Sequence, residues 1–152
     1  MNSYKHALSF AEKAHRGQKD KGGQEYIEHL IFVSTLVNSE DEKIIALLHD
    51  ILEDTKITID DLQKEKFSKK VIEAVDILTK KDNVSYFDYI ENVKKNSIAK
   101  KVKIADLTHN SDITRIPFPT NQDYKRQEKY KLAIDFINDT KFDSYKQYKL
   151  NQ

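Results

Sequence analysis

A histidine and an aspartate, His49 and Asp50, stand next to each other inside an otherwise apolar segment that runs from Ile44 to Leu52. The spacing of the apolar residues predicts a helix face that packs against the core, so the imidazole and the carboxylate need partners that replace lost water. A divalent metal ion would be such a partner for both side chains. We therefore interpret His49 and Asp50 as the start of a candidate metal site.

Two more side chains of metal-binding type are expected to face inward from separate helices. Asp106 follows Ala105 and lies four positions after Val102, on the buried side of a predicted helix. Burying that carboxylate without a partner would cost on the order of several kcal/mol, and a lysine or helix-end amides are the alternatives to a metal ion. His29 lies on the inward face of a helix that opens at Tyr26. Two neutral imidazoles and two carboxylates suit manganese or iron, with positions left open for water and a substrate oxygen.

Helices are expected to position these residues. The 152-residue chain contains only three glycines and two prolines, which favours long helices over strands and frequent turns. Its length fits one compact domain, residues 1–152, built as an all-α bundle of about seven to eight helices. The predicted helices cover residues 3–17, 26–37, 40–53, 58 onward, 71–78, 85–93, 97–110 and 121–136. A glycine-containing loop is expected at residues 18–25, and two prolines exclude helix from residues 115–120.

The composition excludes several classes of chemistry and partner. There is no cysteine, so disulfides, thiolate catalysis and cysteine-ligated zinc or iron–sulfur centres are ruled out. Lys plus Arg (26) nearly balance Asp plus Glu (25), and the net charge of +1 gives no support for a general nucleic-acid or membrane binder. Because no apolar run looks like a signal peptide or spans a membrane, we expect a cytoplasmic protein. The sequence predicts no particular oligomeric state.

Seven short motifs occur in the order typical of one enzyme family. They are Ala14-His15-Arg16-Gly17-Gln18, Lys21-Gly22-Gly23, Tyr26-Ile27-Glu28-His29, Leu47-Leu48-His49-Asp50, Glu53-Asp54-Thr55, Leu78-Thr79-Lys80 and Val102-Lys103-Ile104-Ala105-Asp106-Leu107 with Asn110. From about residue 4 to the last helix the chain closely resembles the HD-domain metal-dependent phosphohydrolases. The resemblance is to the hydrolase domain of the RelA/SpoT alarmone enzymes and its small stand-alone relatives, and it implies the HD-domain helical bundle.

The resemblance implies a division of roles among the acidic and histidine residues. One divalent ion, most often Mn²⁺ and otherwise Fe²⁺ or another transition metal, would be held by His29, His49, Asp50 and Asp106. Glu53 and Asp54 would stand beside it to orient or deprotonate the attacking water. Carboxylates are unfavourable at the carboxyl end of a helix, which supports a purpose for Glu53 and Asp54 beyond helix-end charge.

The predicted contacts to substrate phosphates or ribose are Lys21, Lys103, Asn110 and Arg115. Lysine attracts phosphate as a point charge, and asparagine can hydrogen-bond a sugar hydroxyl. For Lys21 and Arg115, an exposed and solvated side chain is the ordinary alternative. His15 and His109 are interpreted as structural support for the site.

Several positions depart from the pattern of the alarmone hydrolases. Asp20 precedes Lys21 where that family usually has an arginine, so an anion replaces a planar cation that could stack on a base. Glu25 and Leu30 replace common prolines, and Leu107 stands where arginine is frequent. None of these changes removes a predicted metal ligand, so hydrolysis is expected to survive while recognition of the base loosens.

Three functions follow from this reading. The first is a metal-dependent pyrophosphohydrolase of nucleotides, similar to guanosine 3′,5′-bis(diphosphate) 3′-pyrophosphohydrolase. The second keeps the chemistry but acts on another phosphorylated nucleotide or dinucleotide, such as a nicotinamide cofactor phosphate. The third is a nucleotide-sensing module that binds without turnover, which the presence of Glu53 and Asp54 beside a full ligand set argues against.

Overall fold

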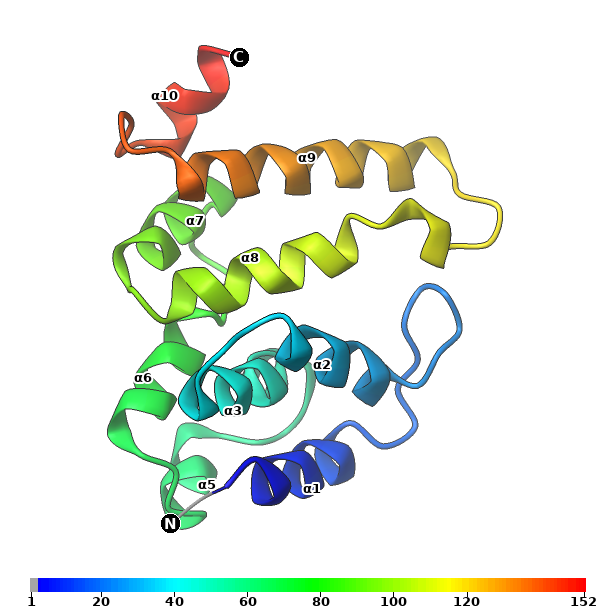
Figure 1. Cartoon of the computed structure of the whole chain (residues 1–152), viewed down its shortest axis with the longest axis vertical. Helices are drawn as coiled ribbons and strands as arrows, with labels where there is room; N and C mark the ends of the chain where they lie inside the picture. The colour runs from blue at the N-terminus through cyan, green and yellow to red at the C-terminus, as the bar shows by residue number, and fades with distance from the viewer. Residues whose placement is uncertain (1–2) are drawn as a thin grey trace.

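Helices form almost all of the regular structure in residues 3–152, the part of the chain that the computed structural model describes (Figure 1). In chain order they are α1 (Tyr4–Ala14), α2 (Tyr26–Thr35), α3 (Glu40–Leu48), α4 (Ile51–Asp54), α5 (Ile59–Lys64), α6 (Lys69–Ile77), α7 (Tyr86–Lys95), α8 (Ala99–Asn110), the 3₁₀ helix η1 (Ile113–Arg115), α9 (Asn121–Asn138) and α10 (Tyr145–Leu150). Within these residues the only β-type pairing recorded is an isolated bridge between Lys19 and Glu25. The predicted all-α class is therefore confirmed.

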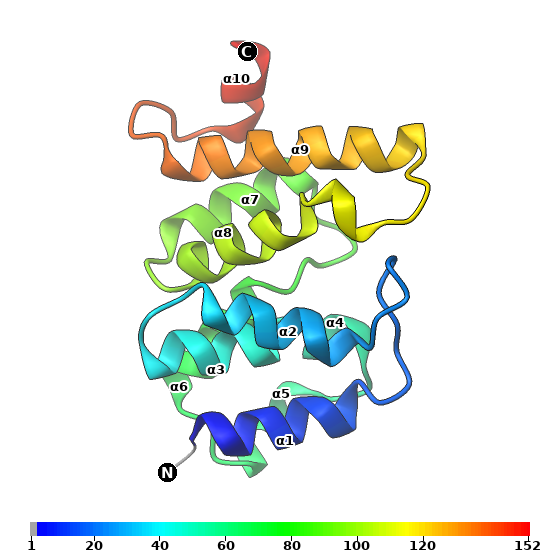
Figure 2. The same cartoon turned by 45° about the vertical axis from the view of Figure 1, so that its right-hand side comes forward.

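The helices stack in successive layers around α3. Figures 1 and 2 show α1 at one end, α2 and α3 above it, then α7 and α8, and finally α9 and α10. Helix α3 contacts α1, α2, α6 and α8. Its residues Ile45, Ala46, Leu47 and Leu48 are all fully buried. The carboxyl end of α3, where His49 follows, consequently lies in the interior of the molecule.

Side-chain caps explain where several helices begin. Ser39 and Glu42 form a capping box at the start of α3, and Thr58 with Asp61 does the same for α5. Thr120 and Asp123 form a third box that starts α9 directly after the proline-containing segment. These local hydrogen bonds satisfy amides that a helix cannot pair internally, so the helix starts could be located from sequence.

Removing the cap of α3 is expected to lower the free energy of unfolding by about 1 kcal/mol. The Ser39 hydroxyl accepts a hydrogen bond from the Glu42 amide at 3.1 Å, and Ser39→Ala leaves that amide unpaired. The change can be measured by urea unfolding followed by circular dichroism. Ser9→Ala, at an exposed position inside α1, is the matched control and should change stability by less than about 0.5 kcal/mol. Equal effects of both variants would contradict the capping role.

The described residues form more α-helices than the seven or eight expected, for two reasons. The predicted helix over residues 40–53 is broken after Leu48, so that His49 and Asp50 form a turn before the short helix α4. A further helix, α10, follows α9 and had no counterpart in the prediction. The first helix ends at Ala14, three residues earlier than expected, and Gly17 adopts a positive φ of 87° in the loop that follows.

Candidate active site

Four side chains from three distant parts of the chain converge at the centre of the bundle. His29 comes from α2, His49 and Asp50 come from the turn between α3 and α4, and Asp106 comes from α8. One nitrogen or oxygen atom from each residue lies within 4.8 Å of the corresponding atom of every other. Asp106 Oδ1 lies 3.0 Å from His29 Nε2 and 3.1 Å from His49 Nε2, and Asp50 Oδ2 lies 3.0 Å from His49 Nε2. The predicted ligand set is thus one spatial cluster.

The break between α3 and α4 allows two adjacent residues to serve the same cluster. Successive side chains of a regular helix point about 100° apart, so His49 and Asp50 in a continuous helix would diverge. At Asp50 the backbone has φ −101° and ψ 1°, outside the regular helix. Both side chains therefore reach the same cluster from one turn.

The hydrogen bonding of His49 fits a metal ligand. Its Nδ1 lies 2.6 Å from the carbonyl oxygen of Ala46, which can only accept, so Nδ1 carries the proton. The opposite nitrogen, Nε2, is then the atom that a cation could bind; it is buried and faces the Asp50 and Asp106 carboxylates, with no hydrogen bond of regular geometry to either. Although burial alone would lower the pKa of His49, the Asp50 and Asp106 carboxylates outweigh it and raise that pKa well above its ordinary value. The cluster attracts positive charge, and two imidazoles with two carboxylates fit a divalent metal ion.

His109 supports His29 from the outer side. The Nδ1 atoms of the two histidines lie 2.8 Å apart, and their rings stack at a centroid distance of 5.0 Å. Burial, followed by the nearby Arg115 cation, lowers the pKa of His109 to about 4, so its ring is neutral at pH 7. A neutral His109 can accept the Nδ1 proton of His29, which leaves His29 Nε2 free to face Asp106.

Asp106 is held by two further side chains of its own helix. Lys103 Nζ lies 3.1 Å from Asp106 Oδ2, and Asn110 Nδ2 donates to Oδ1 at 3.1 Å. Burial would lower the pKa of Lys103, but the Asp106 carboxylate outweighs it and raises that pKa well above its ordinary value. Lys103 therefore stays charged as the ion-pair partner of Asp106. Similarly, the hydroxyl of Tyr26 donates to Asp50 Oδ2.

The two carboxylates of α4 differ in their surroundings. Glu53 Oε1 accepts a hydrogen bond from the backbone amide of Lys80 at 3.2 Å. Burial, and then the negative charges of Asp50 and Glu53, raise the pKa of Asp54 to about 6. The charges of the cluster thus act directly on Asp54, which makes it the better placed of the two to exchange a proton near neutral pH.

Gln18 fixes the end of α4 from the preceding loop. Its Nε2 donates to the carbonyl oxygen of Asp54 at 2.9 Å, and its Oε1 lies 3.0 Å from Nδ1 of the buried His15. His15 therefore contacts α4 indirectly, through Gln18. The sequence predicts no separate role for Gln18, because its partner Asp54 lies 36 positions further along the chain.

A cavity of about 290 Å³ opens beside the cluster. It lies between the loop at residues 18–25, the end of α8, η1 and the first half of α9. Its lining residues are Lys19, Asp20, Lys21, Gly22, Tyr26, Asn110, Asp112, Ile113, Arg115, Ile116, Asp123, Arg126 and Tyr130. Tyr26 and Asn110 connect it to the cluster, because they hydrogen-bond to Asp50 and Asp106 respectively.

The comparison with known families identifies the chain. Residues 7–116 match the family described as HD domain. The chain belongs to the HD domain family. The resemblance inferred from the motifs is therefore confirmed, and it covers the four residues of the cluster as well as Glu53 and Asp54.

Relatives of this HD domain differ greatly in length. A protein of Drosophila melanogaster named guanosine-3′,5′-bis(diphosphate) 3′-pyrophosphohydrolase MESH1 is 33% identical over 150 residues, which cover 88% of this chain and 83% of the relative. A Streptomyces coelicolor protein named GTP pyrophosphokinase is 33% identical over 141 residues, covering 84% of this chain but only 16% of the relative. A solved structure titled as a metazoan ortholog of SpoT that hydrolyzes ppGpp superimposes with a TM-score of 0.72 at 28% identity, covering 88% of this chain and 82% of that one.

The predicted substrate contacts of the HD domain lie in two different places. Lys21, Asn110 and Arg115 line the cavity, whereas Lys103 is absent from the described lining and pairs with Asp106 instead. Arg126 and Tyr130 also line the cavity, and neither was predicted from the sequence. Their spacing of four positions on α9 places them on one helix face, and this is the signal that could have marked them.

Among the described residues, none of the helices has the length and apolar character that a membrane span requires.

Proposed function

We propose that this HD domain is a metal-dependent pyrophosphohydrolase that converts guanosine 3′,5′-bis(diphosphate) to the 5′-diphosphate and free pyrophosphate. The observation that carries the proposal is the buried His29, His49, Asp50 and Asp106 cluster beside a cavity with a partly cationic lining. The name and matching length of the Drosophila relative add support. In the reaction, water attacks the phosphorus bonded to the 3′ oxygen, the bond between them breaks, and the 3′ oxygen takes up a proton.

Mn²⁺ is the proposed metal, because two imidazole nitrogens and two carboxylates suit Mn²⁺ or Fe²⁺ better than a soft ion. Such an ion supplies Lewis-acid polarisation of a phosphoryl oxygen and lowers the pKa of water. The protein residues then have separate tasks. Asp54, with Glu53 beside it, accepts the proton of the attacking water, while Lys103 and Asn110 keep Asp106 in place. Lys21, Arg126 and Tyr130 face the nucleotide in the cavity.

Turnover should decrease at acid pH. A carboxyl group must be ionised to accept a proton, so activity that depends on Asp54 rises as the pH passes its pKa and is lost below it. We expect a midpoint between the ordinary value of 3.8 and about 6, because a bound cation would offset part of the Asp50 charge. The test is kcat measured from about pH 4.5 to 8 with wild type and Asp54→Asn. A midpoint above pH 7, or the same acid limb in Asp54→Asn, would contradict it.

A second substrate class is supported by the pairing of Asp20 with Arg115, which uses up a cation that a multiply phosphorylated nucleotide would need. The alternative substrate is another phosphorylated nucleotide or dinucleotide, such as a nicotinamide cofactor with a 2′-phosphate. The metal-loaded protein should be incubated with a panel of phosphorylated nucleotides. Pyrophosphate released from guanosine 3′,5′-bis(diphosphate) supports the first function, and orthophosphate from a 2′- or 3′-monophosphate supports the second. Binding with no release across the panel would favour a nucleotide sensor.

We also propose that residues 1–152 work as one HD domain. A single cluster of buried residues extends from Ala7 in α1 to Tyr145 in α10, so the helices outside the family match share the same core as those within it.

A further inference from the structure

Asp20 holds its own loop closed through one carboxylate oxygen. Oδ1 accepts hydrogen bonds from the backbone amides of Gly22 at 2.9 Å and Gln24 at 3.0 Å. Gly23 then donates its amide to the Asp20 carbonyl at 3.0 Å and takes a positive φ of 86°. The turn that carries Lys21 is therefore built around this one side chain.

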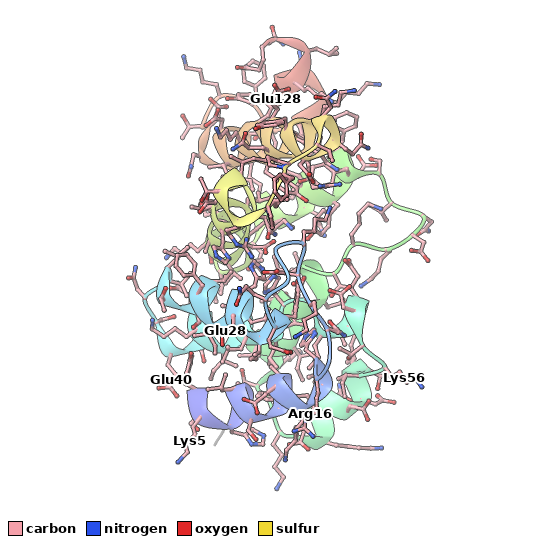
Figure 3. All side chains as sticks on the ribbon, turned by 90° about the vertical axis from the view of Figure 1, so that its right-hand side faces the viewer. Lys5, Arg16, Glu28, Glu40, Lys56 and Glu128 are labelled. Carbon is pink, nitrogen blue, oxygen red and sulfur yellow. The ribbon has the colours of Figure 1, made fainter. Side chains whose placement is uncertain are left out.

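The other oxygen of Asp20 ties the loop to η1. Oδ2 accepts from Arg115 Nη2 at 2.8 Å, and Nη1 of the same guanidinium donates to the His109 carbonyl at 2.9 Å. The backbones also meet here, since a Cβ on Gly22 would lie 2.3 Å from the Arg115 carbonyl oxygen. Figures 1 and 2 show the loop between α1 and α2 extending toward the segment after α8, and Figure 3 shows it on the side facing the viewer. Asp20 and Arg115 are 11% and 22% exposed, so this ion pair is only partly screened by water.

Most cations of the cavity lining have a carboxylate partner. Arg115 pairs with Asp20, Lys19 with Glu25, and Arg126 with Asp123 at 2.9 Å. Among the described lining residues, Lys21 is the cation left without an ion-pair partner. Asp112 adds an anion whose carboxylate accepts from Thr114. The four cations and three carboxylates among the described lining residues leave a net charge of about +1, and Lys21 is the cation that is free to meet a ligand.

We propose that Asp20 determines specificity by engaging Arg115, so that the cavity accepts one phosphate group at the end of the nucleotide remote from the metal cluster, rather than two. The proposal rests on the proposed function and assigns it a preferred substrate class. That class comprises 3′-pyrophosphorylated nucleosides with a 5′-monophosphate, ahead of those with a 5′-diphosphate. Lys21 meets the single phosphate, and the Asp20 carboxylate opposes a second one.

The test compares kcat and KM for the 5′-monophosphate and the 5′-diphosphate of guanosine 3′-diphosphate. Wild type should show the lower KM for the monophosphate. Asp20→Asn keeps an oxygen for the amides of Gly22 and Gln24 but removes the charge that opposes phosphate and holds Arg115. It should shift the ratio of kcat/KM values by about tenfold toward the diphosphate, through KM, with each kcat within about twofold. Arg115→Gln alone should leave the ratio of kcat/KM values close to that of wild type. Adding Asp20→Asn to Arg115→Gln should change this ratio less than Asp20→Asn changes it in wild type.

A matched control and a second readout separate this role from general destabilisation. Asp41→Ala breaks the exposed ion pair with Lys70 at 3.6 Å, which joins α3 and α6, and should leave both KM values unchanged. Amide hydrogen exchange in residues 18–25 of the full chain should quicken in Arg115→Gln, because the loop loses its tie to η1, and should stay unchanged in Asp41→Ala. This readout requires neither metal nor turnover.

Each outcome either supports or overturns the proposal. An unchanged substrate ratio in Asp20→Asn, or a change confined to kcat, overturns it. If neither nucleotide is hydrolysed, the proposed function fails, and the same ratio is measured as dissociation constants of the metal-loaded protein by calorimetry. A tenfold shift in that ratio still supports the role of Asp20, whereas equal shifts for both nucleotides, or no binding of either, overturn it.

Discussion

Replacing Asp50 with asparagine is expected to abolish stable metal binding and to lower turnover by about 10³-fold or more. Asparagine has the shape of aspartate and can still accept the hydrogen bond of Tyr26, so the protein should remain folded. It removes one of the two carboxylates of the cluster, and the charge that draws a cation into the cluster falls with it. Metal content per chain, measured by elemental analysis after loading and desalting, should drop from about one to near zero.

Thermal unfolding gives an independent reading of the same change. A ligand that binds only the folded state stabilises it, by about 2.7 kcal/mol at a concentration of 100 Kd. Added Mn²⁺ should therefore raise the Tm of wild type but not that of Asp50→Asn. Asp76→Asn, which removes an exposed carboxylate paired with Lys81 at 2.7 Å, should keep the metal, the Tm shift and the activity. Full metal content in Asp50→Asn would show that the Asp50 carboxylate is not needed to hold the metal ion, contrary to this prediction.

The second large effect is expected at α4. The double variant Glu53→Ala, Asp54→Ala should lose turnover by about 10²- to 10⁴-fold, while metal content and nucleotide affinity stay close to those of wild type. Of the single variants, Asp54→Asn should lose more than Glu53→Gln, because the cluster charges act on Asp54 whereas Glu53 accepts from the Lys80 backbone. Single-turnover kinetics measures the chemical step, and calorimetry of the same preparations measures nucleotide affinity.

Glu128→Gln is the control for this series. Glu128 is an exposed carboxylate on α9, labelled in Figure 3, and should be replaceable without effect on kcat. Loss of nucleotide affinity in place of turnover would instead assign Glu53 and Asp54 to binding. A double variant with full activity would exclude them from the chemistry.

The sequence alone was enough to predict the four residues of the cluster and most helix starts. Ser39, Thr58 and Thr120 cap their helices through hydrogen bonds that span three residues, so a short stretch of chain contains all the information needed. The inward position of Asp106 followed from helical periodicity, and its side chain is buried in the structure. Together with the motif order, these local features were enough to predict the HD fold and the residues of the cluster.

Tertiary packing decided the features that involve distant residues. The sequence predicted one helix over residues 40–53, since nothing local shows that His49 and Asp50 must both turn into the same cluster. Lys103 was predicted to contact the substrate, but in the structure it pairs with Asp106. A buried carboxylate without a nearby cation would be strongly destabilising.

The role of Asp20 also depends on a residue that is distant in the sequence. As a sequence feature it was an anion where a cation is usual, but its partner Arg115 lies 95 positions away and is brought to it only when the loop packs on η1. Arg126 and Tyr130 join the cavity through the docking of α9 on α8. Periodicity and capping are encoded within a few residues, whereas the charge balance of the cavity depends on which helices come together.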